Sequence, residues 1–91
     1  MPRECRRVRV TGRVQGVAFR AWSRGQARKL GLSGWVRNDG DGSVSALICG
    51  DRAALEAMIT AFWQGPGAAE VRDVQVVAAA RAEITGFEIL R

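Results

Sequence analysis

The order of apolar and polar residues divides the chain into segments of two kinds. Val8 and Val10 alternate with arginines, which predicts a half-buried strand that runs into Thr11. Apolar alternation or short apolar runs between turn residues predict further strands at positions 32–38, 43–49, 71–78 and 87–90. Over residues 19–30 and 51–64 the apolar positions recur every three or four residues, which predicts two amphipathic helices.

The ends of these segments carry the residues expected there. Gly31 and the Gly65-Pro66 pair end the two helices, and Asp51 is the expected N-cap of the second helix. Residues 38–42 read Asn-Asp-Gly-Asp-Gly, a strong turn signal that joins the second and third strands as a hairpin. The side chains that share one face of the third strand are Val44, Ala46 and Ile48.

The first six elements follow the order β-α-β-β-α-β, and residues 87–90 add a last short strand. Two helices on one face of an antiparallel sheet form a ferredoxin-like sandwich, an α+β fold. Residues 1–91 are predicted to form a single domain, because this length supports one hydrophobic core but not two. No apolar run approaches the length needed to cross a bilayer, and none near the start resembles an export signal.

Composition narrows the possible chemistry. The formal net charge is +5, with 14 basic residues, and such a surface attracts anions. Histidine is absent, which excludes Ser–His and Cys–His nucleophile pairs, imidazole metal ligands and a histidine general base. The carboxylates are scattered along the chain, so we expect neither a metal nor a cofactor.

The two cysteines, Cys5 and Cys49, fall on different predicted strands. Because no export signal is evident, we expect both thiols to be reduced and buried rather than joined in a disulfide. The expected compartment is the cytoplasm.

The most specific segment lies between the first predicted strand and the first predicted helix. Residues 12–20 read Gly-Arg-Val-Gln-Gly-Val-Ala-Phe-Arg, a glycine-bearing loop that ends at a helix start. Such a loop directs several backbone N–H groups into one concavity, where the first helical turn adds partial positive charge. Arg20 adds a planar fork of donors suited to a phosphate group. The alternative is a plain turn, in which Gly12 and Gly16 only permit unusual backbone angles and Arg20 is solvated.

The full string resembles the signature of the acylphosphatase family, G-x-V-Q-G-V-x-F-R. A second family element, G-W-V-x-N, is present at residues 34–38, and the F-x-I ending of the family is matched at residues 87–89. The resemblance covers nearly the whole chain. The departures are small: Ala18 stands where the family varies, and the aromatic residue that often closes these chains is absent after Ile89.

The resemblance implies a metal-independent acylphosphatase, an enzyme that hydrolyses acyl phosphates to a carboxylate and inorganic phosphate. In this interpretation Arg20 binds the phosphoryl group in bidentate fashion and Asn38 orients the attacking water. The segment expected to hold the phosphoryl oxygens through its amides comprises Arg13, Val14, Gln15, Gly16, Val17, Ala18 and Phe19. The implied partners are a small acyl phosphate and inorganic phosphate, the latter as product and inhibitor. The enzyme is expected to be a monomer.

Two other functions stay open from the sequence. One is a nucleic-acid-binding module of the same fold, which the basic charge suggests. Its strands lack the paired aromatic motifs that stack bases, so no nucleic-acid partner is expected. The other is an acylphosphatase-like domain that acts on carbamoyl phosphate for a larger maturation protein. Gln15 contacts either the substrate or its own loop, and the residues assigned to packing are Trp22, Trp35 and Trp63.

Overall fold

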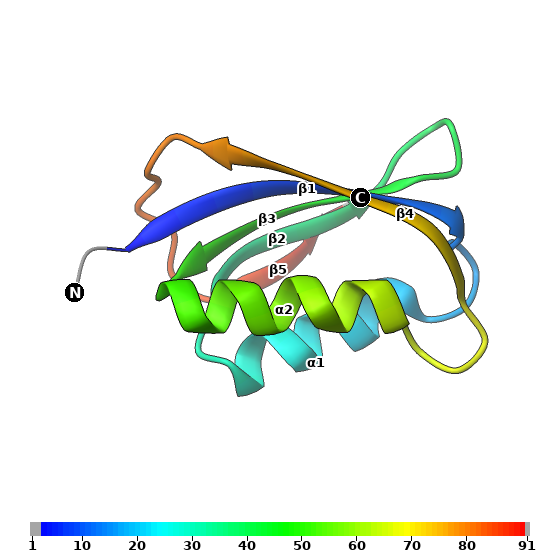
Figure 1. Ribbon diagram of the computed structural model, residues 1–91, viewed down its shortest axis with the longest axis horizontal. Coiled ribbons are helices and arrows are strands. Elements are labelled where there is room, and N and C mark those ends of the chain that lie inside the picture. Colours follow the sequence, from blue (N-terminus) through cyan, green and yellow to red (C-terminus); the bar gives the residue numbers. More distant parts are fainter. Residues whose placement is uncertain (1–2, 91) are drawn as a thin grey trace.

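The structure is a computed structural model that describes residues 3–90, and every predicted element is present in it (Figure 1). The elements are β1 (Glu4–Arg13), α1 (Phe19–Lys29), β2 (Ser33–Asn38), β3 (Val44–Gly50), α2 (Arg52–Gln64), β4 (Glu70–Ala79) and β5 (Phe87–Leu90). The observed boundaries lie within a few residues of the predicted ones. Asp51 occupies the N-cap position of α2, as expected, although its side chain makes no capping hydrogen bond.

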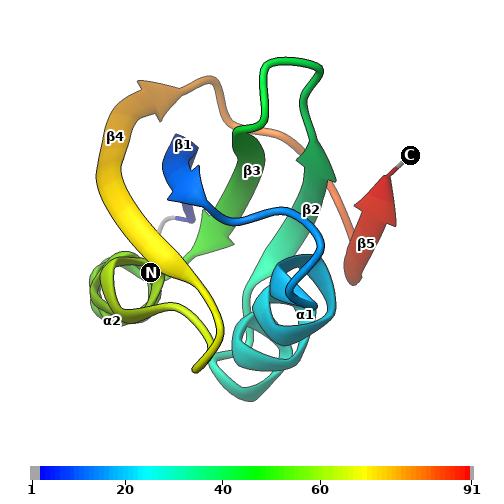
Figure 2. The same cartoon turned by 90° about the vertical axis from the view of Figure 1, so that its right-hand side faces the viewer.

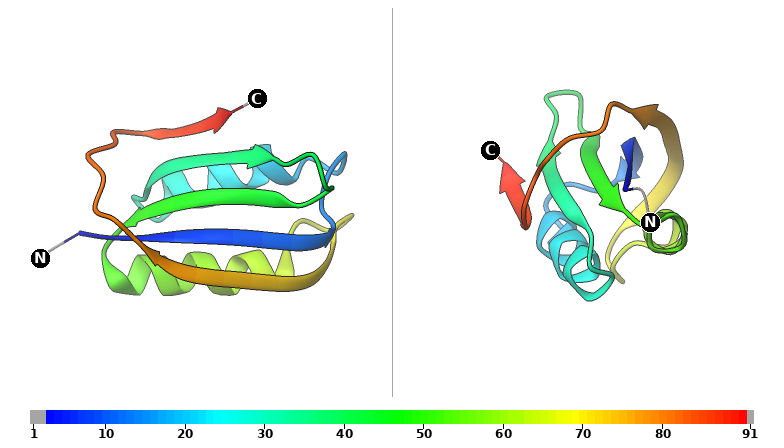
Figure 3. Two further views of the ribbon diagram at one scale, coloured as in Figure 1. Left: turned by 90° about the horizontal axis from the view of Figure 1, so that it is seen from above. Right: turned by 90° about the vertical axis from the view of Figure 1, so that its left-hand side faces the viewer.

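The five strands form one sheet in the order β4-β1-β3-β2-β5. The pairs β4·β1, β1·β3 and β3·β2 are antiparallel, whereas β5 runs parallel to β2 (Figure 3). Phe87 of β5 lies opposite Gly34 of β2. The ferredoxin-like sandwich is therefore confirmed, and its sheet is mixed rather than wholly antiparallel. A four-residue strand such as β5 carries no sequence signal for its direction, because its alternation is the same in either orientation.

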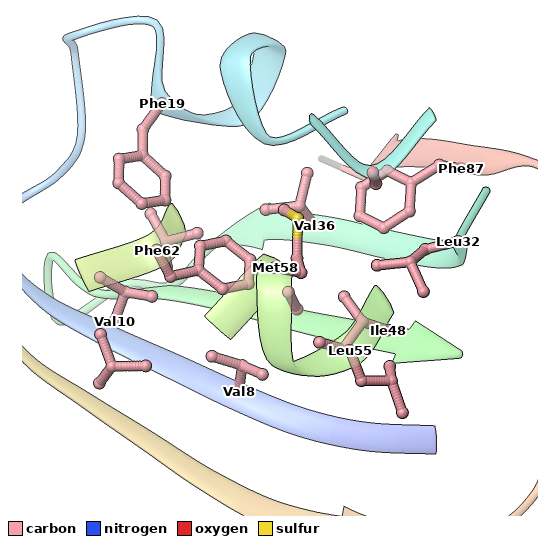
Figure 4. Packing of buried hydrophobic residues seen from close by; sticks show 14 of the residues in the cluster. Val8, Val10, Phe19, Leu32, Val36, Ile48, Leu55, Met58, Phe62 and Phe87 are labelled. Atoms are coloured by element: carbon pink, nitrogen blue, oxygen red, sulfur yellow. The ribbon is translucent and has the colours of Figure 1, made fainter. Parts of the chain in front are cut away.

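Both helices cover the same face of the sheet (Figure 2). The core between the layers is built from the inward valines of β1, the alternating apolar residues of β3 and the buried stripe of α2 (Figure 4). Phe19 of α1 and Phe62 of α2 stack with their ring centroids 6.1 Å apart. Burial of each such side chain contributes roughly 1.5–3 kcal/mol to folding. This contact fixes the first turn of α1 against α2.

The far end of β4 departs from its predicted pattern. Val74 is buried, but Val76, on the same predicted face, is 36% exposed. Figure 1 shows this end of β4 curving away from α2, which leaves Val76 partly uncovered.

The face of the sheet away from the helices carries Trp35. The guanidinium carbons of Arg7 and Arg37 lie 5.3 and 4.9 Å from the centroid of its ring. Trp35 also packs against Leu47, which lies opposite it in the ladder of β2 and β3. Its assignment to packing is consistent with these contacts.

Cys5 and Cys49 form a disulfide, and the expectation of two reduced thiols is wrong. The two residues lie directly opposite each other in the ladder of β1 and β3, with their Cα atoms 4.1 Å apart. Ala82 and Ile84 of the segment between β4 and β5 pack over the bridge. The sequence indicated the strands but not their register, which decides whether two cysteines meet. The cytoplasmic location, which rested in part on reduced thiols, stays a prediction.

Neither α1 nor α2 is long and apolar enough to span a membrane.

Candidate active site

Residues 14–18 connect the end of β1 to the start of α1 and pass beside the end of β2 (Figure 2). Glycine is required near the end of β1, just before the loop. Gly12 has a φ of +121°, and a Cβ there would overlap the carbonyl oxygen of Glu70. Gly16 has a φ of +74°, and Ala18 is also left-handed, with a φ of +59°. A non-glycine residue in this conformation carries about 1–2 kcal/mol of strain. The two left-handed residues turn the chain back toward the helix start.

The N-terminus of α1 is open. Ala18 occupies the N-cap position without a side-chain capping bond, and the first turn contains no acidic residue. The first helical bond runs from the Trp22 N–H to the Ala18 carbonyl, at 3.0 Å. The N–H groups of residues 19–21 therefore have no acceptor inside the helix, and the helix dipole places partial positive charge beside them. This arrangement suits an anion.

The residues of this first turn line a cavity of about 190 Å³. The residues that line it are Val14, Gly16, Ala18, Phe19, Arg20, Ala21, Asn38 and Ile89. They come from the loop, the first turn of α1, the end of β2 and β5. Pockets for drug-sized ligands usually exceed about 300 Å³, so this cavity fits a small anion with a short substituent.

Arg20 provides the cationic side chain of the cavity. Its Nη1 donates a long hydrogen bond, 3.4 Å, to the carbonyl oxygen of Leu90 in β5. Among residues 3–90 it has no carboxylate partner, unlike Arg9 and Arg37, which pair with Asp41 and Asp39. Within this part of the chain its positive charge is uncompensated.

Asn38 is the last residue of β2 and brings a carboxamide to the same cavity. Its Oδ1 is buried and accepts no hydrogen bond from any residue in the range 3–90. A buried acceptor without a donor costs roughly 1–3 kcal/mol. Asn38 therefore carries an acceptor that residues 3–90 leave unused.

The hairpin that follows Asn38 is held by the carboxylate of Asp39. This carboxylate accepts hydrogen bonds from Ser45, Ser43 and Arg37, the last two at 3.1 and 3.2 Å. These bonds, chiefly the one from Ser45, keep the pKa of Asp39 below its usual range. The turn beside Asn38 is therefore fixed by a charged group that stays ionised at neutral pH.

Most of the predicted site residues meet at this cavity. Arg20 and Asn38 line it together with Val14, Gly16, Ala18 and Phe19 of the predicted loop, whereas Arg13, Gln15 and Val17 do not. Arg13 is exposed at the end of β1, and Val17 packs against the core. The side chain of Gln15 is directed to the hairpin, where it hydrogen-bonds backbone carbonyls.

Two lining residues were missed by the sequence reasoning. The place of Ala21 at the site could have been predicted from helix geometry, because the third residue of an uncapped helix also leaves its N–H without a partner. Ile89 lies in the F-x-I ending, which matched the family but was given no role at the site. Its part in the cavity depends on the pairing of β5 with β2, a tertiary feature.

In residues 3–90 no three His, Cys, Asp or Glu side chains are grouped so as to hold a metal ion.

The fold and the cavity define a small α+β protein with an arginine-lined cavity between a helix start and a strand end. The family model of acylphosphatase matches residues 6–89, and the chain belongs to the acylphosphatase family. An acylphosphatase of Rhizobium meliloti (strain 1021) is 55% identical over 85 residues, which cover 92% of this chain and 90% of that protein.

Solved structures agree with the sequence comparisons. An acylphosphatase from Coxiella burnetii superposes with a TM-score of 0.94 at 34% identity, covering 97% of this chain and 93% of the other. A Bacillus subtilis acylphosphatase gives a TM-score of 0.93 at 36% identity, covering 97% and 99%. The protein is an enzyme of this family, and its reaction is the hydrolysis of acyl phosphates.

Proposed function

We propose that the phosphoryl group of the acyl phosphate binds at the open start of α1 and that Asn38 orients the water that attacks it. The observation that carries this proposal is that Asn38, whose side-chain oxygen has no hydrogen-bond donor among residues 3–90, lines the same cavity as Arg20. An acceptor is needed on one side of phosphorus to hold water, and donors are needed on the other side to hold the phosphoryl oxygens.

The donors come from the loop and from α1. Gly16, Ala18, Arg20 and the rest of the first helical turn line the cavity, and their amides together with the guanidinium of Arg20 are the proposed donors. Each hydrogen bond to a charged group contributes roughly 1.5–3 kcal/mol, and a helix N-terminus about 0.3–1 kcal/mol. Arg20, with a fork of donors, therefore supplies the largest single share of phosphate affinity.

Asn38 positions water but does not remove its proton. A carboxamide oxygen accepts a hydrogen bond from water, and the amide nitrogen can donate to a phosphoryl oxygen, but neither acts as a base. The leaving group is a carboxylate, which departs without a strong general acid. The proton of water passes to the phosphate of the substrate itself.

The enzyme works without a metal in this proposal, because Arg20 and the helix start supply the positive charge that phosphoryl transfer requires. The enzyme is proposed to act as a monomer. The location of the enzyme is proposed to be the cytoplasm.

Phosphate release from benzoyl phosphate tests the proposal. Turnover should persist in excess chelator, and inorganic phosphate should inhibit competitively. Asn38→Ala should lower kcat by about a hundredfold or more, because misplaced water loses the in-line geometry. Its inhibition by phosphate should stay close to that of the wild type. Loss of wild-type turnover on chelation contradicts the metal-free mechanism, and an unchanged kcat in Asn38→Ala contradicts the water-orienting role.

A further inference from the structure

The side chain of Gln15 leaves the phosphate-binding loop and reaches the hairpin after Asn38. Its Nε2 donates to the carbonyl oxygen of Asp39 at 2.8 Å and to that of Ser43 at 2.9 Å. A glutamine amide has two N–H donors, and both are used in these bonds. The side-chain N–H groups of Gln15 are therefore directed at the protein and not at a ligand.

The two accepting carbonyls belong to opposite ends of the turn that joins β2 to β3. The Asp39 N–H donates to the Ser43 carbonyl at 2.9 Å, and the Gly42 N–H donates to the Asp39 carbonyl at 3.2 Å. Both carbonyls thus keep a backbone donor when Gln15 is removed. The turn is closed by its own backbone, and Gln15 adds a link from outside it.

This link joins two segments that the sheet does not join directly. β3 lies between β1 and β2 in the sheet, so no ladder hydrogen bond runs from β1 to β2. The loop at residues 14–18 leaves β1, whereas Asn38 ends β2. Among the side-chain hydrogen bonds of residues 3–90, those of Gln15 are the ones that connect this loop to the segment 38–43.

We propose that Gln15 is a positioning residue that holds Asn38 at a set distance from the phosphate-binding loop. It acts on the alignment of water with phosphorus and leaves the binding of phosphate unchanged. The proposal rests on the roles proposed above for Asn38 and the loop.

Gln15→Met tests it, because methionine keeps the length of the side chain and removes both donors. We expect kcat to fall about tenfold to a hundredfold, as a displacement of about 1 Å at a reacting centre does. The inhibition constant of inorganic phosphate should stay within about twofold of the wild-type value. Gln75→Met, on β4 and away from the cavity, is the matched control and should leave both values unchanged.

A double-mutant cycle separates positioning from the alternatives. If Gln15 acts through Asn38, then Gln15→Met should lower kcat by less than about twofold in an Asn38→Ala background. A full additional loss in that background overturns the proposal, and so does a phosphate inhibition constant that rises in parallel with KM. A loss of kcat that only matches a loss of folded protein in thermal melts overturns it as well.

These outcomes are distinct from a failure of the proposed function. Wild-type kcat in Asn38→Ala contradicts the role of Asn38 itself. A low kcat in Asn38→Ala, combined with independent effects of the two substitutions, contradicts only the role of Gln15.

Discussion

Arg20, in the first turn of α1, and Asn38, the last residue of β2, line the same cavity. The cation therefore lies on the helix side of the cavity and the carboxamide on the sheet side. In the proposed mechanism, Arg20 holds the phosphoryl group from one side while Asn38 holds water on the other.

Replacement of Arg20 should weaken phosphate binding strongly. Arg20→Ala removes up to two charge-assisted hydrogen bonds, so we expect kcat/KM to fall about a hundredfold or more and phosphate inhibition to weaken by a similar factor. Arg20→Lys should recover only part of this loss, because a point charge does not reproduce the fork of donors. Steady-state kinetics with phosphate as inhibitor measures both effects. Arg24→Ala, one turn further along α1 and outside the cavity, should behave as the wild type, and full activity in Arg20→Ala would contradict the assignment.

Removal of the disulfide should lower stability but spare the cavity. The bridge closes a loop with a sequence separation of 44, which corresponds to about 4 kcal/mol on the chain-entropy estimate. A Cys5→Ala and Cys49→Ala double variant should lose about 2–4 kcal/mol of unfolding free energy in urea titrations. Its kcat at 25 °C should be close to normal, because the bridge lies at the start of β1 and the loop follows its end. A reductant should destabilise the wild type and not the double variant.

Acid should loosen the hairpin between β2 and β3. Hydrogen bonds from the Ser43 side chain and backbone, and then from Arg9, lower the pKa of Asp41 to about 2. A carboxyl whose pKa is lower in the folded than in the unfolded state stabilises the fold above its unfolded pKa of about 3.9. That stability is lost as the pH falls from this value toward about 2. Urea unfolding of Asp41→Asn should therefore depend less on pH over this window than unfolding of the wild type. If the unfolding free energies of the two proteins changed in parallel with pH, that result would contradict the lowered pKa of Asp41.

Gly12→Ala should be strongly destabilising. The added Cβ would overlap the Glu70 carbonyl and lie 2.7 Å from the Arg72 nitrogen, both of which are backbone atoms of the adjacent strand. A left-handed φ adds strain, so a loss of about 3 kcal/mol or more is expected. Gly40→Ala, in the exposed hairpin turn with nothing within 4 Å of its Cβ, is the control and should change stability by less than about 1 kcal/mol. Equal unfolding free energies for the two variants would contradict the close approach of β1 to β4.

The local features of the fold could be predicted from the sequence, because periodicity, helix stops and turn residues are local properties. The cavity could be predicted in part because the loop and Asn38 belong to short motifs that resemble those of the acylphosphatase family. Register and strand direction are tertiary properties, and the features that depend on them were missed or wrong. They include the Cys5–Cys49 bridge, the parallel pairing of β5 and the place of Ile89 in the cavity.

The hydrophobic periodicity of the sequence also failed to predict the polar residues inside the core. Ser23 is fully buried, and its Oγ donates a hydrogen bond to the Phe19 carbonyl at 2.8 Å, within the same helix. A hydroxyl that is satisfied by its own backbone behaves as a small core residue. Hydrophobic periodicity does not detect such a position.

The docking of β5 has a kinetic consequence for refolding. Ile89 forms part of the cavity wall and the Leu90 carbonyl accepts a hydrogen bond from Arg20, so the cavity is complete only once β5 is paired with β2. Turnover after dilution from denaturant should therefore return no earlier than the pairing of this four-residue strand, a step that also buries Phe87 in the core.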